Sequence, residues 1–142
     1  MKRTLCTLLF VALGLGAQQV HFTAVDIFVD SPNAPLAAYQ LEFVAHGNQV
    51  RIAGIEGGEH DAFKTPPFYD PKAMQQERVI LAALNAAQPG KLPTGKTRVA
   101  TVHLQFAGPQ PPTFSLKLQT AADSEGTIIS VQTTFTERGR YE

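Results

Sequence analysis

The feature that most constrains the fold is a repeated alternation of apolar and polar side chains, interrupted by short turn-rich segments. The clearest run extends from Thr97 to Phe106, where apolar side chains occupy every second position. Side chains of a β-strand point alternately to opposite faces, so this pattern is typical of a strand with one face in a core. Comparable runs occur at residues 20–30, 36–45, 49–55, 114–119 and 127–135.

Segments rich in Pro, Gly, Asn and Asp separate these runs, and no long helical pattern lies between them. The sequence therefore predicts an all-β fold, an antiparallel β-sandwich of jelly-roll or immunoglobulin-like type with about seven to nine strands. The tight turn at His46–Asn48 predicts a hairpin between the runs at 36–45 and 49–55.

Residues 77–84 are apolar at adjacent positions and leave two interpretations open. Val79 and Ile80 favour a central strand covered on both faces, whereas the alanines and leucines that follow favour a buried helix.

The first residues, MKRTLCTLLFVALGLGAQQ, combine two cations, an apolar run and small residues. This is the pattern of a secretory signal peptide, and we expect cleavage near Ala17. An uncleaved membrane anchor is the alternative, although the apolar run is short for a bilayer span. Residues 1–17 are thus predicted as a signal peptide and residues 18–142 as a single domain with no membrane span after cleavage.

The only cysteine, Cys6, lies in this leader, so the mature chain would have no disulfide. An exported domain without disulfides suits a bacterial protein, either secreted or in the periplasm or cell envelope. With 12 basic and 12 acidic residues, the chain has no net positive charge that would attract phosphates. Nucleic acid is therefore not expected as a partner.

The segment from Glu56 to Lys72 departs from the strand pattern and concentrates acidic, imidazole and aromatic side chains, and connecting loops commonly carry function. The predicted partner-binding residues are Glu59, His60, Asp61, Phe68, Tyr69 and Asp70. A metal held by Glu56, Glu59, His60 and Asp61 is the alternative to a solvated acidic turn. Because adjacent residues of an extended segment point in opposite directions, no metal site and no cofactor are predicted.

The aromatic residues of the segment could form a rigid platform for a sugar or a partner chain. For Phe63 and Phe68 we expect instead that the rings fold back over an open end of the sandwich, because phenylalanine has no polar group. Tyr69 is compatible with either position. His21, His46 and His103 stand far apart and are expected to be surface residues.

Enzyme motifs are missing: the chain has no Gly-x-Ser-x-Gly elbow, no phosphate loop and no metalloprotease helix motif. Paired acids such as Glu56 and Asp70 could serve a glycosidase only at a defined separation, which the sequence does not fix. We therefore expect a protein that is not an enzyme.

Three stretches, residues 36–43, 50–58 and 97–106, resemble the cohesin domain and the related carbohydrate-binding β-sandwich superfamily. The resemblance implies a secreted, non-catalytic binding module for a protein partner or a polysaccharide. Two alternatives stay open: a metal-dependent or glycoside-directed hydrolase using the Glu59–Asp70 loop, and a structural assembly domain of the cell envelope.

Overall fold

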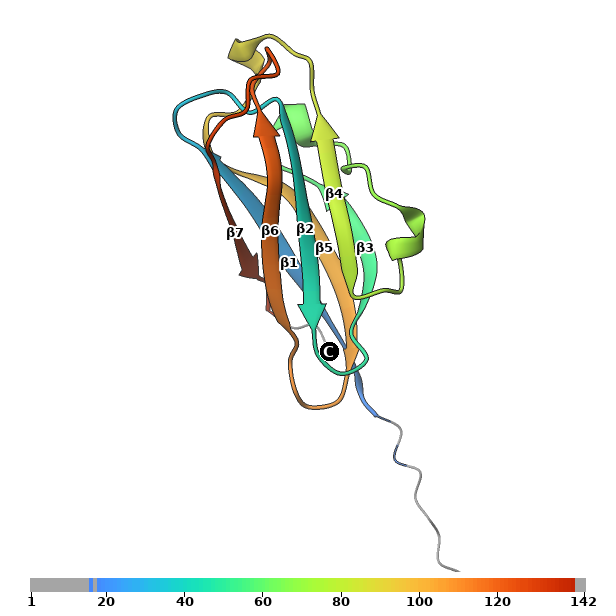
Figure 1. Ribbon diagram of the computed structural model, residues 1–142. Coiled ribbons are helices and arrows are strands. Elements are labelled where there is room, and N and C mark those ends of the chain that lie inside the picture. The colour runs from blue at the N-terminus through green and yellow to red at the C-terminus, as the bar shows by residue number, and fades with distance from the viewer. Residues whose placement is uncertain (1–15, 17, 140–142) are drawn as a thin grey trace, which may run out of the picture.

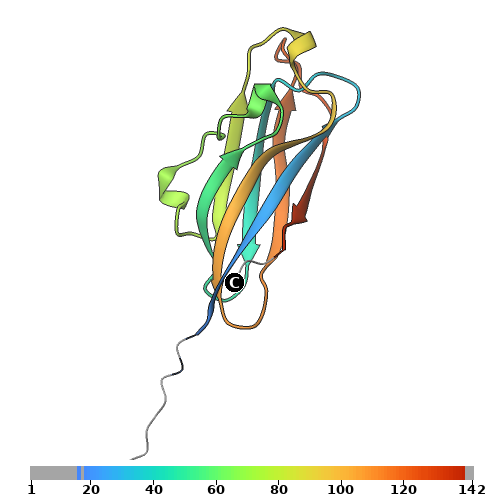
Figure 2. The ribbon, with the colours of Figure 1, turned by 180° about the vertical axis from the view of Figure 1, so that it is seen from behind.

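The computed structural model describes Gly16 and residues 18–139, which form two antiparallel β-sheets packed face to face (Figures 1 and 2). The strands are β1 (Val20–Ser31), β2 (Ala38–His46), β3 (Arg51–Gly57), β4 (Arg78–Leu84), β5 (Gly95–Ala107), β6 (Thr113–Ala122) and β7 (Gln132–Glu137). Three short 3-10 turns, η1 (Asp61–Phe63), η2 (Pro71–Ala73) and η3 (Pro89–Lys91), interrupt the connections. The predicted all-β sandwich is confirmed.

The larger sheet has the strand order β3-β5-β1-β7 and the smaller sheet the order β4-β2-β6. Figure 1 shows the smaller sheet in front, and Figure 2 shows the larger sheet from the opposite side. The longest pairing joins β1 to β5, from Val20 opposite Ala107 to Ser31 opposite Gly95. The first strand of the domain therefore lies inside the larger sheet, between β5 and β7.

The core lies between the two sheets and is built from the inward-facing half of each alternating strand. On β1, Val25, Ile27 and Val29 are each 0% exposed, and on β2 Leu41 and Phe43 are equally buried. Hydrophobic burial is the main favourable contribution to folding, so this alternation selects which face of each strand turns inward.

The predicted hairpin between residues 36–45 and 49–55 is wrong. The two strands belong to different sheets, because β2 pairs with β4 and β6 whereas β3 pairs with β5. The turn at His46–Asn48 therefore carries the chain across the sandwich. Alternation fixes which side chains face inward, but a core between two sheets accepts the same pattern from either sheet.

Residues 78–84 form a strand, which excludes the helical interpretation. However, β4 is the edge strand of the smaller sheet rather than a central strand. Its alternate residues Val79 and Leu81 are buried, and Leu84 at its end is 71% exposed. The apolar residues on its outer side are thus only partly covered.

The last predicted strand, residues 127–135, is displaced toward the C-terminus. The observed β7 spans Gln132–Glu137, and Ile128 forms only an isolated bridge with Ala122. Residues 127–131 instead follow the end of β6 before the chain crosses to the larger sheet.

The predicted signal peptide, including Cys6, lies outside the described residues apart from Gly16. Within the described part of the chain, no helix has the length and apolar character needed to span a bilayer.

Candidate functional site

The segment between β3 and β4 begins with two glycines that allow a very close approach of backbones. A Cβ on Gly57 would lie 2.0 Å from the carbonyl oxygen of Lys64, and one on Gly58 would lie 2.2 Å from that of Arg98. The N–H of Gly58 donates to the carbonyl of Phe63 at 2.7 Å. These contacts draw the segment against the end of the larger sheet and give η1 a fixed position.

Phe63 folds back into the core, as predicted. Its side chain is 2% exposed, and its ring packs edge-on against that of Tyr39 with 5.5 Å between the ring centres. Burial raises the pKa of Tyr39 well above its ordinary value because the phenolate would be poorly solvated there. This ring pair anchors the segment to the sandwich.

Phe68 does not fold back, and its prediction is wrong: the residue is 79% exposed. Its backbone is nevertheless fixed beside β4, because its N–H donates to the carbonyl of Ala82 at 2.7 Å and its carbonyl accepts from the N–H of Ala82 at 3.0 Å. This two-way bridge occupies the edge of β4 at Ala82 and leaves the ring of Phe68 in solvent. Tyr69 is half-buried and packs against the core.

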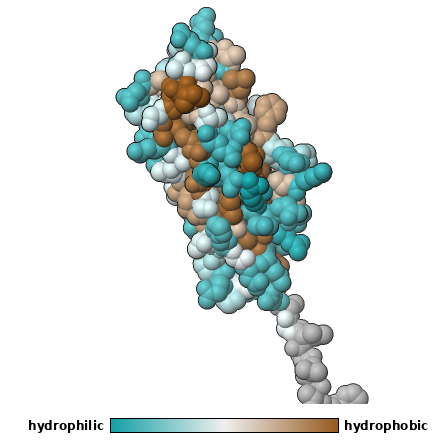
Figure 3. Space-filling model, viewed as in Figure 1, coloured by the Kyte–Doolittle hydropathy of each residue, from teal (hydrophilic) through white to brown (hydrophobic). Residues whose placement is uncertain are grey.

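The exposed ring of Phe68 lies beside a cavity of mixed polar and apolar lining at the end of β4. The cavity has a volume of about 270 Å³ and is lined by Ala62, Phe63, Thr65, Pro66, Pro67, Phe68, Ala83, Leu84 and Asn85. Over the smaller sheet, hydrophobic groups gather toward the end where β4 and β6 finish (Figure 3). Leu84, which sequence reasoning did not select, thus joins Phe68 at this surface.

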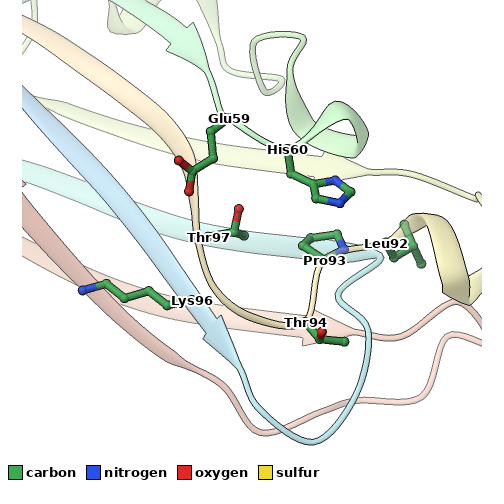
Figure 4. A pocket seen from close by; sticks show the side chains of 7 residues that line it. All are labelled: Glu59, His60, Leu92, Pro93, Thr94, Lys96 and Thr97. Atoms are coloured by element: carbon green, nitrogen blue, oxygen red, sulfur yellow. The ribbon is translucent and has the colours of Figure 1, made fainter.

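Glu59 and His60 are used to hold the local backbone. A carboxylate oxygen of Glu59 accepts from the backbone N–H of Arg98 at 2.8 Å, and Nδ1 of His60 accepts from the N–H of Ala62 at 3.0 Å, which caps η1. Both side chains line a groove of about 530 Å³ whose other wall comes from Leu92 to Thr97. Figure 4 shows this groove, with the Lys96 side chain extending away from the imidazole.

Asp61 and Asp70 do not join these groups. Asp61 is exposed, with its carboxylate 3.8 Å from the ammonium group of Lys64. Asp70 is the N-cap of η2 and accepts from the N–H of Lys72 at 3.0 Å, as the Asp-Pro sequence indicates. Among the described residues, no three His, Cys, Asp or Glu side chains are grouped so that they could hold a metal ion.

A second polar group, which sequence reasoning missed, covers the outer face of the larger sheet. Asp26 accepts hydrogen bonds from the hydroxyl of Thr101 at 2.6 Å and from Nε of Arg138 at 2.9 Å. Arg98 in turn donates to the hydroxyl oxygen of Thr101 at 2.9 Å. Burial raises the pKa of Asp26, but these hydrogen bonds and the two guanidinium charges outweigh it, and the net pKa is lowered.

On the same face, Nε2 of His103 lies 2.9 Å from a carboxylate oxygen of Glu56. This hydrogen bond lowers the pKa of Glu56, although both side chains are well exposed. His103 is thus a surface residue with an acidic neighbour. The outward position of His103 on a predicted strand indicated a surface residue. Its contact with Glu56 depends on the pairing of β3 with β5, which the sequence pattern does not show.

Comparisons of the chain with protein-family models, with curated proteins and with solved structures found no match. The two-sheet sandwich implied by the resemblance to cohesin domains is present, and no family is identified beyond that architecture.

Proposed function

We propose that this protein is an exported, non-catalytic β-sandwich module that binds a protein partner through the Glu59–Asp70 loop and the adjoining end of β4. The observation that carries the proposal is Phe68, whose ring is 79% exposed while its backbone is held by two hydrogen bonds to Ala82. An aromatic ring presented on a fixed backbone offers contact area with little further loss of conformational freedom on binding.

The surroundings of Phe68 favour a protein over a polysaccharide. Its neighbour Leu84 is 71% exposed and offers an aliphatic surface, as does the exposed Pro66 of the cavity, whereas Pro67 is buried. The side chain of Asn85 is already engaged, since its amide donates to the carbonyl of Ala62 and its oxygen accepts from the N–H of Ala87. Sugar sites need polar groups for the hydroxyls, whereas an apolar anchor of a partner protein needs a surface of this kind.

The charged residues of the loop fit a supporting role in this proposal. Glu59, His60 and Asp70 each accept a backbone N–H, which shapes the loop. Asp61 and Lys64 are exposed at its rim, where charges affect association rate and selectivity more than affinity. A hydrolase would need carboxylates aimed at a substrate, and this arrangement gives that alternative no support.

The test uses the mature chain as bait against a bacterial envelope extract, with captured proteins identified by mass spectrometry and affinities measured on the purified partner. Phe68→Ala and Leu84→Ala are each expected to weaken binding at least about 10-fold, as interface anchors do. Ile128→Ala is the matched control, because Ile128 is also 71% exposed but follows the opposite edge of the smaller sheet.

Equal binding by Phe68→Ala and the wild type would refute this site. A polysaccharide panel run by affinity electrophoresis provides the second arm. Retardation by a polysaccharide that depends on Phe68 would replace the protein partner by a glycan.

A further inference from the structure

The two sides of the sandwich differ in how their edge strands are covered. On one side, the backbone of Gln75 and Gln76 bonds to β3 at Ile52, and the backbone of Phe68 bonds to β4 at Ala82. On the other, open side lie the edges of β6 and β7, each paired with one neighbour only. Within the described part of the chain, only the end of β6 is covered, by residues 127–129.

Side chains along the open side are incompletely covered. Phe114, Leu116 and Leu118 on β6 and Phe135 on β7 pack against the core but are only partly buried, whereas Phe43 on the neighbouring β2 is 0% exposed. The rings of Phe114 and Phe135 meet edge-on across the gap between the sheets, 6.1 Å apart. A further strand on the edge of β6 would add cover to this apolar row and satisfy the free backbone groups.

Charges on the outer face of the smaller sheet alternate in sign from strand to strand. Arg78 on β4 donates to a carboxylate oxygen of Glu42 on β2, and Glu42 is paired in register with Lys117 on β6. Lys117 is exposed at the edge of the sheet. A strand added beside β6 would therefore place one of its residues directly opposite Lys117. Opposite charges on directly paired residues are favourable, and an acid is therefore the complementary residue at that position.

A second copy of this chain does not supply that acid through the same strand. β6 reads TFSLKLQTAA, with one cation and no acidic residue. A lysine on an edge strand also disfavours indiscriminate pairing between copies. These features disfavour pairing of β6 with β6 of a second copy and favour a strand that carries a carboxylate.

We propose that the free edge of β6, from Thr113 to Gln119, binds an extended segment of another protein as an added antiparallel strand. The segment would place apolar side chains over the row at Leu116 and an acidic side chain opposite Lys117. Main-chain hydrogen bonds would supply affinity and the alternating side chains selectivity. This surface is separate from the Phe68 site and does not depend on it.

The probe is a soluble seven-residue peptide of alternating valine and threonine with one threonine replaced by glutamate, matched by the same peptide with lysine in that position. Wild-type protein is expected to bind the glutamate peptide about 3- to 10-fold more tightly, as follows from a cross-strand charge pair made attractive rather than repulsive. Lys117→Glu should reverse this order, and Lys117→Gln should abolish the preference. Lys72→Glu, a change at an exposed lysine on η2, should leave the order unchanged.

Amide hydrogen exchange locates the peptide. Peptide binding should slow exchange in β6 and leave exchange unchanged in β3, which lies at the opposite side of the sandwich and is bonded at Ile52 to residues 75 and 76. Binding by Phe68→Ala should equal that of the wild type, so failure of the loop site and of this edge are distinguishable. The proposal is overturned if neither peptide binds at millimolar concentration, if the Lys117 variants keep the wild-type order, or if β6 is protected by dimerisation of the protein.

Discussion

Replacing Phe63 and Phe68 by alanine, one at a time, is expected to affect stability very differently, although both belong to one connection. Burying a phenylalanine removes about 200 Å² from water, worth about 25 cal/mol per Å². Phe63 is 2% exposed and Phe68 is 79% exposed. The free energy of unfolding should therefore fall by as much as about 5 kcal/mol for Phe63→Ala and by about 1 kcal/mol for Phe68→Ala.

Equilibrium unfolding in urea measures the difference. The chain has no tryptophan, so circular dichroism is the suitable signal. With a slope of about 2 kcal/mol per M, the midpoint should drop by as much as about 2.5 M for Phe63→Ala and by about 0.5 M for Phe68→Ala. Similar drops for the two variants would refute the inference that one ring belongs to the core and the other to a binding surface.

Three further changes test other parts of the structure. Gly57→Ala should lower the free energy of unfolding by about 2–3 kcal/mol, because its Cβ would meet the Lys64 carbonyl oxygen at 2.0 Å; Gly90→Ala, with nothing within 4 Å, is the control for urea unfolding. The folded-state pKa of Asp26 is lowered from 3.8, so the ionised carboxylate stabilises the fold above that pH, and this stabilisation is lost as pH falls through the folded-state pKa. Urea unfolding should therefore show Asp26→Asn less stable than the wild type at neutral pH. The difference in the free energy of unfolding should disappear in acid below the folded-state pKa. Tyr39→Phe should cost at most about 1 kcal/mol by thermal denaturation, because its hydroxyl makes a single long bond of 3.4 Å to a backbone carbonyl.

The sandwich could be predicted because burial acts on each strand separately. The alternation around Val25 and around Leu104 shows which side of each strand is apolar, and both residues are 0% exposed. Sheet membership depends instead on pairings between distant segments. The predicted hairpin failed for that reason, since nothing local to His46–Asn48 distinguishes a turn within one sheet from a passage between two.

The location of the candidate site stays a prediction, whereas the structure shows where the side chains of its loop lie. The departure from strand pattern pointed to the loop, and the Asp70-Pro71 pair gave the cap of η2. Phe63 is buried where its ring packs against Tyr39, whereas Phe68 is exposed where its backbone bonds to Ala82. Composition treats the two rings as equivalent, so this distinction was not available from the sequence.

The position of β1 between β5 and β7 has a consequence for the order of folding. During synthesis, β1 can pair with β5 only once the residues from 95 onward have been made, and with β7 only once those from 132 onward have been made. Contacts so distant in sequence make folding slow, on a scale of milliseconds to seconds. The larger sheet therefore stays incomplete during synthesis until β7, its last strand, has been made. Loss of the segment after Ser130 would leave β1 as a bare edge and prevent the sheet from reaching its final width.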